Sequence, residues 1–467
     1  MSDSRTNATS VIESSTDDLA TQRYLLDMAL QPLDQWEGFT RLEQIGGSAL
    51  RYQLNYVCYA LAMAQYTRTP AFGGYLAEAQ ANMIRKMCDK KVWGYWAPER
   101  LIGYGRWNPD PMVFANVMYT GFFAAMLAFY ETLNEDRSFD DAGTLTLVWN
   151  HRRRFDYGFH RIAEAIEHNM QISPHTLYPC EPHLIYPMCN TIALNGLSGY
   201  DRLHGQNLSA GLADRIRASF IDNGYLKSNG RFQFGLGPAG LKIPPTLSND
   251  AVMAYWLNGV MPDLAEQTWR SMRDHRMTII DRALTLQTQS VDHLDVGSYK
   301  KSDAWTWVNV ACAAREMGDA EAAEAADAGI AQRFDMTYSS SGARRIANAS
   351  TWVNCAFALA QFMSTNSLQG VSMGRVPAAW RSGPMLSAAA YPEVLVAMAV
   401  TDGTGLNLVL RPGAGKVRTR LEVSRLTPGH QYRVTGAVDD HVIADQDGRA
   451  LFDIELSERR EVQLSRV

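Results

Sequence analysis

Cysteine, long apolar runs and runs of one charge are all scarce in this chain. Its 467 residues include six cysteines: Cys58, Cys88, Cys180, Cys189, Cys312 and Cys355. No stretch of about eighteen consecutive apolar residues is present, so no membrane insertion is expected. The formal net charge is −5 and long basic runs are missing. This composition argues against nucleic acid as a partner.

The first residues lack the features of an export signal. Residues 1–18 have neither the basic start nor the apolar stretch of a signal peptide. They are rich in Ser, Thr and Asp, so we predict a disordered polar tail over residues 1–20. Without an export signal the chain is expected in the cytoplasm, where its cysteines are reduced thiols. A disulfide between Cys180 and Cys189 stays an open alternative.

Helical patterning dominates residues 21–365. Apolar residues recur at helical spacing in one segment after another, for example in residues 50–66 and 112–133. Short and long connections alternate between these segments. This favours an α/α toroid, in which inner and outer helices alternate and the long loops gather over a central cavity. We therefore predict a mainly α protein with a catalytic (α/α)6-type barrel over residues 21–365.

The pattern changes after Thr365. Short alternating runs follow, separated by turns such as Asp402-Gly403 and Asp447-Gly448. Alternation bounded by turn residues predicts strands. Residues 375–467 are accordingly predicted to be a small all-β domain, a sandwich of about six to eight strands. It contains no catalytic cluster, so its expected role is structural.

Residues 180–190 gather groups that can transfer protons. They read Cys-Glu-Pro-His-Leu-Ile-Tyr-Pro-Met-Cys-Asn, and thiols, carboxyls and imidazoles can all pass protons near neutral pH. The apolar spacers would raise the pKa values of the thiols and the carboxyl and lower that of the imidazole. Such a site suits proton transfer on an apolar substrate. Alternatively, both cysteines are small buried hydrophobic residues.

This segment, followed by Tyr-Asp-Arg-Leu-His-Gly at 200–205, resembles the core signature of the linalool dehydratase-isomerase family. Supporting matches are Val92-Trp93-Gly94 with Trp96, the Asn-x-Met-Tyr-x-Gly segment at 116–121, and Arg-Glu-Met-Gly-Asp at 315–319. The resemblance covers residues 25–365. It implies an α/α-barrel enzyme without a cofactor, which dehydrates a tertiary allylic alcohol to a diene and interconverts allylic alcohol isomers. It also implies a homo-oligomer with the active site near a subunit boundary.

The resemblance assigns several residues to the site. The family's two signature cysteines face the substrate and correspond to Cys180 and Cys189. Its pocket methionine corresponds to Met118, and the aromatic residue three positions before the second cysteine is kept as Tyr186. A free thiol has a pKa of about 8.5, so a neutral thiol can donate a proton and a nearby thiolate can accept one.

Other positions depart from the family pattern. Phe122 stands where the family has a histidine that contacts the substrate hydroxyl, and His183 stands where it has an aspartate. A family aspartate and tyrosine near the N-terminus have Asp34 and Phe39 as their nearest candidates. A pocket tyrosine late in the chain aligns near residues 249–250. The thiols are kept while the hydroxyl-binding partners differ, so we predict a hydrophobic alkenol or terpenoid other than linalool.

Each candidate has a structural alternative. His183 is a base or a loop histidine bonded to backbone, and Asp250 is an acid or, with Ser248 and Asn249, a helix cap. Met118 and Phe122 share a helix face as core or as pocket lining. The predicted catalytic residues are Cys180, Cys189, His183 and Asp250. The predicted substrate-binding residues are Met118, Tyr119, Phe122, Glu181, Tyr186, Asn190, Trp96, Asn249 and Asp34.

Three other functions stay open. Cys180, His183 and Cys189 supply three possible ligands for zinc, although the resembled family needs no metal. A polysaccharide lyase or glycosidase would stack sugars on the aromatic loop at residues 92–107. It would also need two paired carboxylates, which sequence alone cannot select from Glu99, Asp110, Glu181 and Asp250. A non-catalytic binding scaffold is the third alternative.

Overall fold

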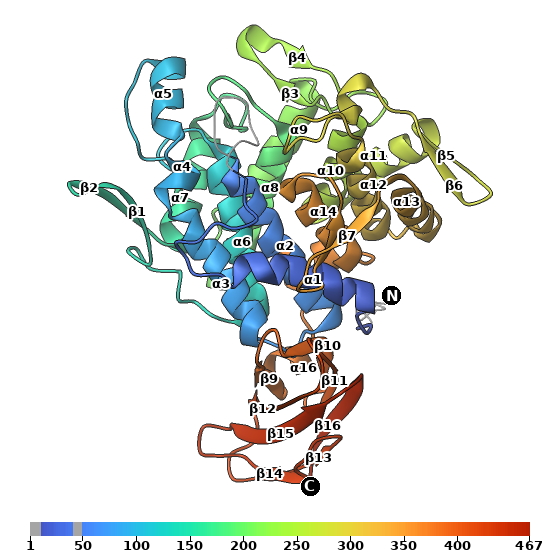
Figure 1. The fold of residues 1–467 in the computed structure, drawn as a ribbon. Coiled ribbons are helices and arrows are strands. Elements are labelled where there is room, and N and C mark those ends of the chain that lie inside the picture. Colours follow the sequence, from blue (N-terminus) through green and yellow to red (C-terminus); the bar gives the residue numbers. More distant parts are fainter. Residues whose placement is uncertain (1–10, 41–48) are drawn as a thin grey trace, which may run out of the picture.

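The computed structural model describes residues 11–40 and 49–467, which divide into a helical part and a strand-rich part (Figure 1). Helices run from Thr16 to Ser382, with short hairpins between them, and longer strands run from Met385 to Arg466. The predicted order, a helical core followed by a strand-rich C-terminal region, is confirmed.

Long helices in the middle of the helical part contact one another in a closed ring. Each contacts the next one along the chain, and the last contacts the first. These inner helices are α2 (Leu50–Arg68), α6 (Val117–Asn134), α8 (Pro187–His204), α10 (Leu247–Leu257), α12 (Ala304–Glu316) and α14 (Thr351–Phe362). Their first turns meet, as in the contact of Arg51 with Met118 and the stacking of Tyr52 on Trp352. The helices therefore start at one end of the ring, which we call the starting end.

A second set of helices covers the ring from outside. Each packs on one or two inner helices. These outer helices are α1 (Thr16–Ala29), α3 (Gly74–Met87), α7 (Phe159–Ile172), α9 (Leu212–Asp222), α11 (Pro262–His275) and α13 (Ala320–Arg333). Inner and outer helices alternate along the chain, which is the alternation expected from the sequence.

Burial patterns distinguish the two layers. Every residue of α2 is buried, and a helix that is buried on all sides belongs inside a core. Helix α11 instead buries one stripe, which includes Leu264, Thr268 and Met272 at helical spacing. An apolar stripe of this kind covers a core from one side only, so α11 lies in the outer layer.

Helices α6 and α8 approach each other closely because small residues line their contact. A Cβ on Gly121 would lie 2.5 Å from the Cβ of Ala193, and one on Gly199 would lie 2.7 Å from the Cβ of Ala128. Glycine is required where backbones pack this tightly. The two helices are consequently a rigid pair that extends from the starting end to the opposite end of the ring.

Most connections into the inner helices are long and carry small elements. The aromatic loop predicted at residues 92–107 is partly helical. Asp89 caps its first short helix by accepting from the Lys91 N–H, and Gly105, with φ +67°, ends its second. The short helices and 3-10 turns are α4 (Lys90–Trp93), α5 (Trp96–Tyr104), η1 (Pro238–Gly240), η2 (Ser290–His293), α15 (Ser367–Ser372) and α16 (Ala378–Ser382). The paired hairpin strands are β1 (Leu145–Asn150), β2 (Arg153–Tyr157), β3 (Gly235–Leu236), β4 (Lys242–Ile243), β5 (Met277–Ile280), β6 (Ala283–Leu286), β7 (Met336–Tyr338) and β8 (Arg344–Ile346).

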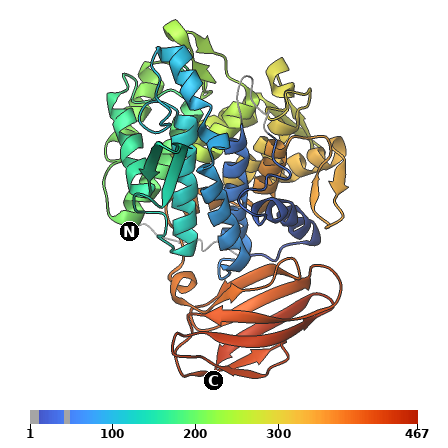
Figure 2. The same ribbon diagram turned by 60° about the vertical axis from the view of Figure 1, so that its left-hand side comes forward.

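The C-terminal strands form two antiparallel sheets below the helices (Figure 2). Their bounds are β9 (Met385–Ala388), β10 (Val394–Thr401), β11 (Leu406–Pro412), β12 (Val417–Ser424), β13 (Gln431–Thr435), β14 (His441–Ile443), β15 (Ala450–Leu456) and β16 (Arg460–Arg466). One sheet has the order β10-β11-β16-β13-β14 and the other the order β15-β12-β9. Buried and exposed residues alternate along β13 and β15, so one face of each strand is turned to a core. Strand β15 contacts β11 and β14 of the other sheet.

Backbone hydrogen bonds join the strand-rich part to the helical part. The N–H of Ala71 donates to the carbonyl of Ala399 at 3.0 Å, and its carbonyl accepts from the Leu386 N–H at 2.9 Å. The predicted all-β domain begins too early, because α16 (Ala378–Ser382) lies inside its bounds and β9 starts only at Met385.

The N-terminal tail is shorter than predicted. Helix α1 begins at Thr16, because Ser15 accepts from the Asp18 N–H while Asp18 accepts from the Ser15 N–H, a reciprocal cap. Glu13 makes ion pairs with Arg411 and Arg459 of the strand-rich part. The predicted disorder of residues 11–20 is therefore wrong, and residues 1–10 lie outside the described part of the chain.

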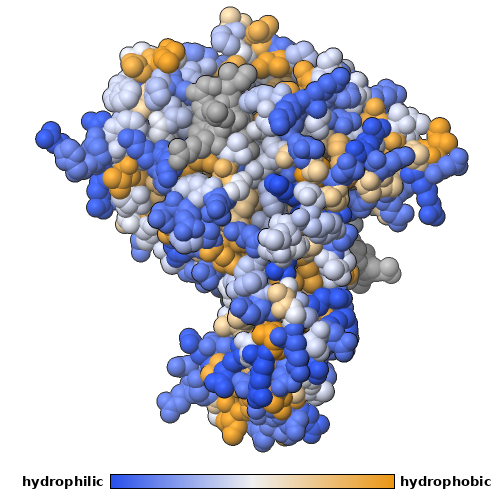
Figure 3. Space-filling view, viewed as in Figure 1, coloured by the Kyte–Doolittle hydropathy of each residue, from blue (hydrophilic) through white to orange (hydrophobic). Residues whose placement is uncertain are grey.

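The face of the molecule drawn in Figure 3 shows no large apolar patch among the described residues. In Figure 3 the visible face is mostly hydrophilic, and the apolar residues lie in small separate groups. Within the residues described, no helix is both long and apolar enough to cross a bilayer.

Candidate active site

The two motif cysteines lie together at the starting end of the ring. Cys180 precedes α8 and Cys189 lies in its first turn. Both are buried and both are free thiols, so the disulfide alternative is wrong. Burial raises the pKa of the Cys180 thiol well above its ordinary value, and a side-chain hydrogen bond with Cys189 raises it further. The neutral thiol of Cys180 is therefore the favoured form.

Asn190 holds the loop that carries Cys180. Its Nδ2 donates to the carbonyls of Tyr178 and Tyr186, each at 3.1 Å, and its Oδ1 accepts from the Tyr178 N–H at 3.0 Å. The Cys180 N–H donates to the Leu184 carbonyl at 2.8 Å. Asn190 was predicted to bind substrate, but its side chain is committed to the loop backbone and so positions Cys180.

Arg51, in the first turn of α2, is the cation of this site. Its guanidinium is fully buried and lies 4.2 Å from the ring centroid of Tyr95 and 4.6 Å from that of Tyr52. Its Nη2 lies 3.2 Å from Met118 Sδ. The positive charge lowers the pKa of Cys180, against the larger effect of burial. Arg51 therefore favours a thiolate when one forms.

Sequence analysis missed Arg51. The sequence feature that could have identified it is an arginine in the first turn of a strongly apolar helical segment. A guanidinium is almost never buried without partners, so such a position indicates a buried charge with a role.

Two carboxyl groups share the field of Arg51. Glu181 follows Cys180, and Glu99 lies on α5. Burial raises the pKa of Glu99 to about 7, Arg51 opposes this effect, and Glu181 adds to it. Oε2 of Glu99 is buried and has no hydrogen-bond partner among the described residues. A carboxyl with a pKa near 7 can exchange protons at neutral pH. Sequence analysis considered Glu99 only for carbohydrate chemistry.

Aromatic rings surround the thiols on the side of α2 and α14. Tyr52 stacks on Trp352 with centroids 4.3 Å apart and meets Phe122 edge-on at 5.5 Å. Trp305 packs on Trp352 at 5.0 Å. Met118 Sδ lies 3.4 Å from the Tyr52 hydroxyl. Met118 and Phe122 thus lie on one side of α6, in apolar surroundings that suit a hydrocarbon.

Tyr186 borders the same site from the start of α8. Its ring meets Phe234 edge-on at 5.2 Å. Burial raises the pKa of the Tyr186 hydroxyl, and the nearby Glu181, Cys180 and Cys189 add to the shift. This proximity agrees with its predicted place beside the cysteines.

Tyr119 and Trp96 were also predicted to bind substrate, and the structure shows where each of them lies. The Tyr119 hydroxyl donates to the Met87 carbonyl of α3 at 2.8 Å, so Tyr119 points outward from the ring and its prediction as a binding residue is wrong. Trp96 is fully buried, and its Nε1 has no hydrogen-bond partner among the described residues. A buried indole cannot serve as an open stacking platform for sugars.

His183 and Asp34 lie away from the thiols. His183 takes φ +62°, and this turn directs its exposed ring to α5, where Nε2 lies 2.9 Å from the Gly103 carbonyl and the ring packs on Tyr104 at 4.6 Å. Asp34 is exposed in the loop after α1, close enough to Lys86 to favour that residue's charge. The predicted base His183 and the predicted binding residue Asp34 are therefore not assembled with Cys180, and neither is the zinc set that was left open as an alternative.

Asp250 is neither a cap nor a free acid. Thr246 caps α10 by accepting from the Asn249 N–H at 3.0 Å. Asp250 accepts from Arg231 Nε at 2.6 Å and from the Phe232 N–H at 3.0 Å. Burial raises its pKa to about 6 although Arg231 opposes this shift. Asp250 therefore fastens the 223–246 connection to α10. Asn249 is buried, and its side-chain N and O atoms have no partner among the described residues.

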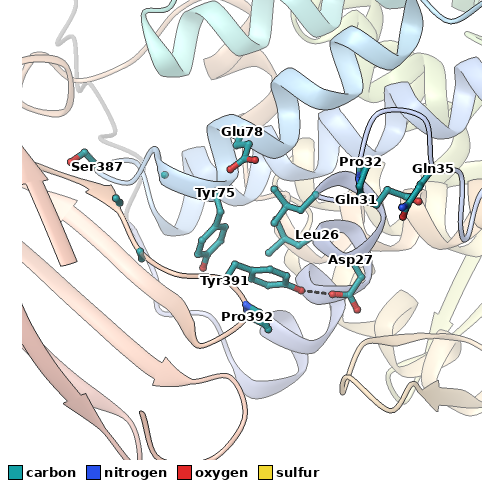
Figure 4. A pocket seen from close by; sticks show the side chains of 14 residues that line it. Leu26, Asp27, Gln31, Pro32, Gln35, Tyr75, Glu78, Ser387, Tyr391 and Pro392 are labelled. Carbon is teal, nitrogen blue, oxygen red and sulfur yellow. Dashed lines mark hydrogen bonds between the residues drawn. The ribbon is translucent and has the colours of Figure 1, made fainter. Parts of the chain in front are cut away.

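A cleft of about 850 Å³ lies elsewhere, between α1, α3 and the segment from β9 to β10 (Figure 4). Tyr391 donates to Asp27 within it at 2.5 Å. Leu26 and Tyr75 also line this cleft. This cleft contains none of the predicted site residues. It lies between the helical part and the strand-rich part and is distinct from the thiol site.

Solved structures with similar chain paths are distant. An inactive variant of the α-1,6-mannanase GH76A of Salegentibacter sp. HEL1_6 is 10% identical, with a TM-score of 0.42 over 77% of this chain and 99% of that chain. An unsaturated glucuronyl hydrolase specific for heparin is 8% identical, with a TM-score of 0.43 over 74% of this chain and 96% of that one. Similarity at this level does not transfer a substrate.

The sequence itself matches a family model. The model described as linalool dehydratase/isomerase matches residues 51–352. This span begins at Arg51 and ends at Trp352, so it contains the thiol pair and the aromatic rings around it. The chain belongs to the linalool dehydratase/isomerase family.

Proposed function

We propose that the chain is a lyase or isomerase that transfers protons on a hydrophobic alkenol or terpenoid, without a cofactor in the reaction. The carrying observation is the contact of two buried thiols, Cys180 and Cys189, beside the buried cation of Arg51. Family membership supports the reaction class, and the aromatic surroundings support an apolar substrate.

The proposed dehydration uses the thiol pair as acid and base. One thiol donates its proton to the substrate hydroxyl as the C–O bond breaks and water leaves. The other, as a thiolate favoured by Arg51, removes a proton from the neighbouring carbon as the C=C bond forms. The proton of the acid has then left with the water, and the base holds the proton from the substrate carbon, so the acid is now the thiolate and the base the thiol. A single transfer between the two sulfur atoms restores the resting pair. Isomerisation would return water to the other end of the allylic cation.

Replacing either cysteine tests this mechanism. General acid–base groups contribute about 10²- to 10⁴-fold, so Cys180→Ala and Cys189→Ala should each lower turnover by that factor. Turnover is measured as diene formed from a panel of acyclic allylic alcohols by gas chromatography. Cys58→Ala is the matched control, because Cys58 is equally buried but lies within α2. Near-normal turnover in both site variants, with a diene-forming wild type, would make the thiols packing residues.

Phe122 is proposed to select a more hydrophobic alkenol, because it removes the polar contact that the family histidine makes with the substrate hydroxyl. Its ring packs edge-on against Tyr52, where the family places a polar contact. Phe122→His should therefore add or raise activity on simple tertiary allylic alcohols. Phe123→His is the matched control, since Phe123 packs against Tyr119, which points outward from the ring. Equal responses of the two variants across the alcohol panel would contradict the shared pocket geometry.

A glycoside hydrolase is the second candidate. One observation favours it: of the four carboxylates considered, Glu99 and Glu181 interact with each other, and glycosidases need such a pair. Aryl glycosides distinguish the two candidates. We expect no hydrolysis of them, whereas hydrolysis that is lost in Glu99→Gln and kept in Cys180→Ala would favour the second function.

The finer architecture is proposed on the same basis. The closed ring of inner helices with its outer layer supports an (α/α)6-type barrel, and the two contacting sheets support a β-sandwich. We propose a domain boundary between Ser382 and Met385, later than the sequence suggested.

A cytoplasmic homo-oligomer with the site near a subunit boundary stays a prediction. Light scattering tests it, and a strictly monomeric active species would contradict it.

A further inference from the structure

A second cluster of titratable side chains lies at the opposite end of α6 and α8. Glu131 is in the last turn of α6, and His204 is the last residue of α8. Asp140 follows α6, and His160 is in the first turn of α7. The cluster therefore joins three helices and one connecting loop.

The ligand atoms of this cluster converge. The ligating atoms of Asp140, His160 and His204 all lie within 4.8 Å of one another. His204 Nε2 lies 3.1 Å from Glu131 Oε2 and 3.6 Å from Asp140 Oδ1. Two imidazoles and the Asp140 carboxylate thus converge, and the Glu131 carboxylate adjoins them through His204. Small movements would let a divalent ion replace these mutual contacts.

The converging atoms are buried, and they contact one another rather than hydrogen-bond donors and acceptors of the surrounding described residues. The side chains of His204, Glu131 and Asp140 are 4%, 1% and 10% exposed. Both carboxylate oxygens of Glu131, Oδ1 of Asp140 and Nε2 of His204 have no hydrogen-bond partner among the described residues outside the cluster. Buried polar atoms are normally satisfied, and two adjacent buried carboxylates repel each other. Both features are expected of a site built around a cation.

The surroundings orient the imidazoles as metal ligands require. Nδ1 of His160 lies 2.9 Å from the Tyr200 hydroxyl, which leaves Nε2 for a metal. Metal-binding histidines usually engage their other ring nitrogen in this way. Phe159 and Tyr200 pack against the His204 ring with centroids 5.7 and 4.6 Å away. These contacts exclude water and fix the ring plane.

We propose that Glu131, Asp140, His160 and His204 bind a divalent transition metal, with Zn²⁺ as the best-matched ion. Nitrogen and carboxylate oxygen ligands in a four-coordinate set suit zinc. Calcium and magnesium prefer oxygen ligands alone. The ion fastens the ends of α6 and α8 to the start of α7.

The role of this site is structural rather than catalytic. Glu131 lies thirteen residues after Met118 along α6, which places the two about 20 Å apart at the helical rise. His204 lies fifteen residues after Cys189 along α8, a similar separation. The metal therefore does not reach the thiols, and the proposal stands independently of the proposed alkenol chemistry.

Metal content is the first test. Untagged protein, stripped with a chelator and then dialysed against Zn²⁺, should retain about one zinc per chain by atomic emission. Its melting temperature should rise with added Zn²⁺, because an ion that binds only the folded state stabilises it. Co²⁺ should give a visible absorption spectrum of nitrogen and oxygen ligation, without the intense thiolate band that binding at Cys180 and Cys189 would produce.

Variants locate the ion. His204→Gln and His160→Gln should each lose zinc and the Zn²⁺-dependent rise in melting temperature. His183→Ala, which removes an exposed histidine, and Cys180→Ala should keep both. Because a His204 variant could fail to fold, the Co²⁺ spectrum of the unaltered protein is an independent arm. Zinc that stays bound in both histidine variants, or no zinc above background in the unaltered protein, would overturn the proposal; in the second case the two carboxyl groups share a proton instead.

Discussion

At the starting end of the ring, Cys180, Cys189 and Arg51 lie among aromatic rings, whereas at the opposite end Glu316 is buried among hydrogen-bond donors. Its two oxygens accept from the Leu368 N–H at 2.8 Å, from the Gln369 N–H at 2.9 Å and from the Asn258 amide at 2.8 Å. The first environment leaves protons free to move, while the second surrounds a carboxyl with donors that favour its ionised form.

The two ends of the ring therefore differ in role. The groups proposed to react lie at the starting end, and a group that stabilises the fold lies at the opposite end. Both ends bury ionisable groups, and burial raises the pKa of Glu316 to about 7, as it does for Glu99. The hydrogen bonds to Glu316 stabilise its ionised form and oppose the shift. Glu99 has a buried oxygen without such a bond. Variants at the starting end should therefore reduce turnover, and variants at the opposite end should reduce stability.

The largest effect is expected for Arg51→Met. This change removes the buried positive charge that acts on Glu99 and Glu181, each of which has one buried carboxylate oxygen. Breaking a buried ion pair costs about 3 to 5 kcal/mol of unfolding free energy. Loss of one preorganised donor costs about 10²- to 10³-fold in rate. Chemical denaturation and diene formation measure the two effects. Full turnover in a folded variant would remove Arg51 from the chemistry.

Asp250→Asn tests whether every polar group at the starting end takes part in the reaction. Asp250 lies near that end but is paired with Arg231, whose side chain is 11% exposed. We expect a loss of about 3 to 5 kcal/mol, because the variant leaves a buried guanidinium unpaired. Turnover per folded molecule should stay the same.

A surface pair controls for this effect. Asp263 also binds an arginine, Arg217, but Asp263 is 63% exposed. Asp263→Asn should cost at most about 1 kcal/mol. If Asp250→Asn stayed as stable as Asp263→Asn but lost turnover, Asp250 would belong to the chemistry after all, and the division between the two ends would fail.

Sequence periodicity was sufficient to predict the order of helices and strands, because buried stripes and alternation are local signals. The motif also predicted the two thiols, since both flank one short loop and the start of one helix. Side chains in loops were harder to place. The direction of His183 depends on a positive φ, and the cap of α10 is Thr246 rather than the Asp250 that was considered.

Groups joined only by tertiary contacts were not predictable. Arg51 and Glu99 are 48 positions apart, and both depend on the ring for their burial. His204 and Glu131 meet because glycines allow α6 and α8 to pack closely. Nothing in the local sequence of either residue indicates the other. The same limit explains why the boundary near residue 365 was placed too early, since α15 and α16 are short.

Glu316→Gln should have a smaller effect, confined to stability. The new amide would direct a donor at groups that already donate, such as the Leu368 N–H. A hydrogen bond to a charged group contributes about 1.5 to 3 kcal/mol, and we expect a loss near the lower limit. Glu324→Gln, an exposed change on α13, should stay within about 0.5 kcal/mol of the unaltered protein. Thermal and urea unfolding compare the two. A loss of turnover per folded Glu316→Gln molecule would contradict the comparison.

The smallest effect is expected in the pH dependence of Glu99→Gln. Because the folded pKa of Glu99 is raised to about 7, the stability that it contributes is present below the ordinary carboxyl pKa and is lost as pH rises through 7. The unfolding free energy of the unaltered protein should therefore fall across this range. The variant should lose the share of that slope that Glu99 contributes, while Glu316 and Asp250 keep theirs.

The same titration should appear in the rate. Once ionised, Glu99 competes with the thiolate for the charge of Arg51, so turnover should decline modestly on the alkaline side of pH 7. Glu99→Gln should remove this inflection, while Glu324→Gln should keep it. An unchanged pH–rate profile in Glu99→Gln, together with an unchanged stability slope, would mean that Glu99 is ionised throughout and that the charge of Arg51 outweighs the burial of this carboxyl.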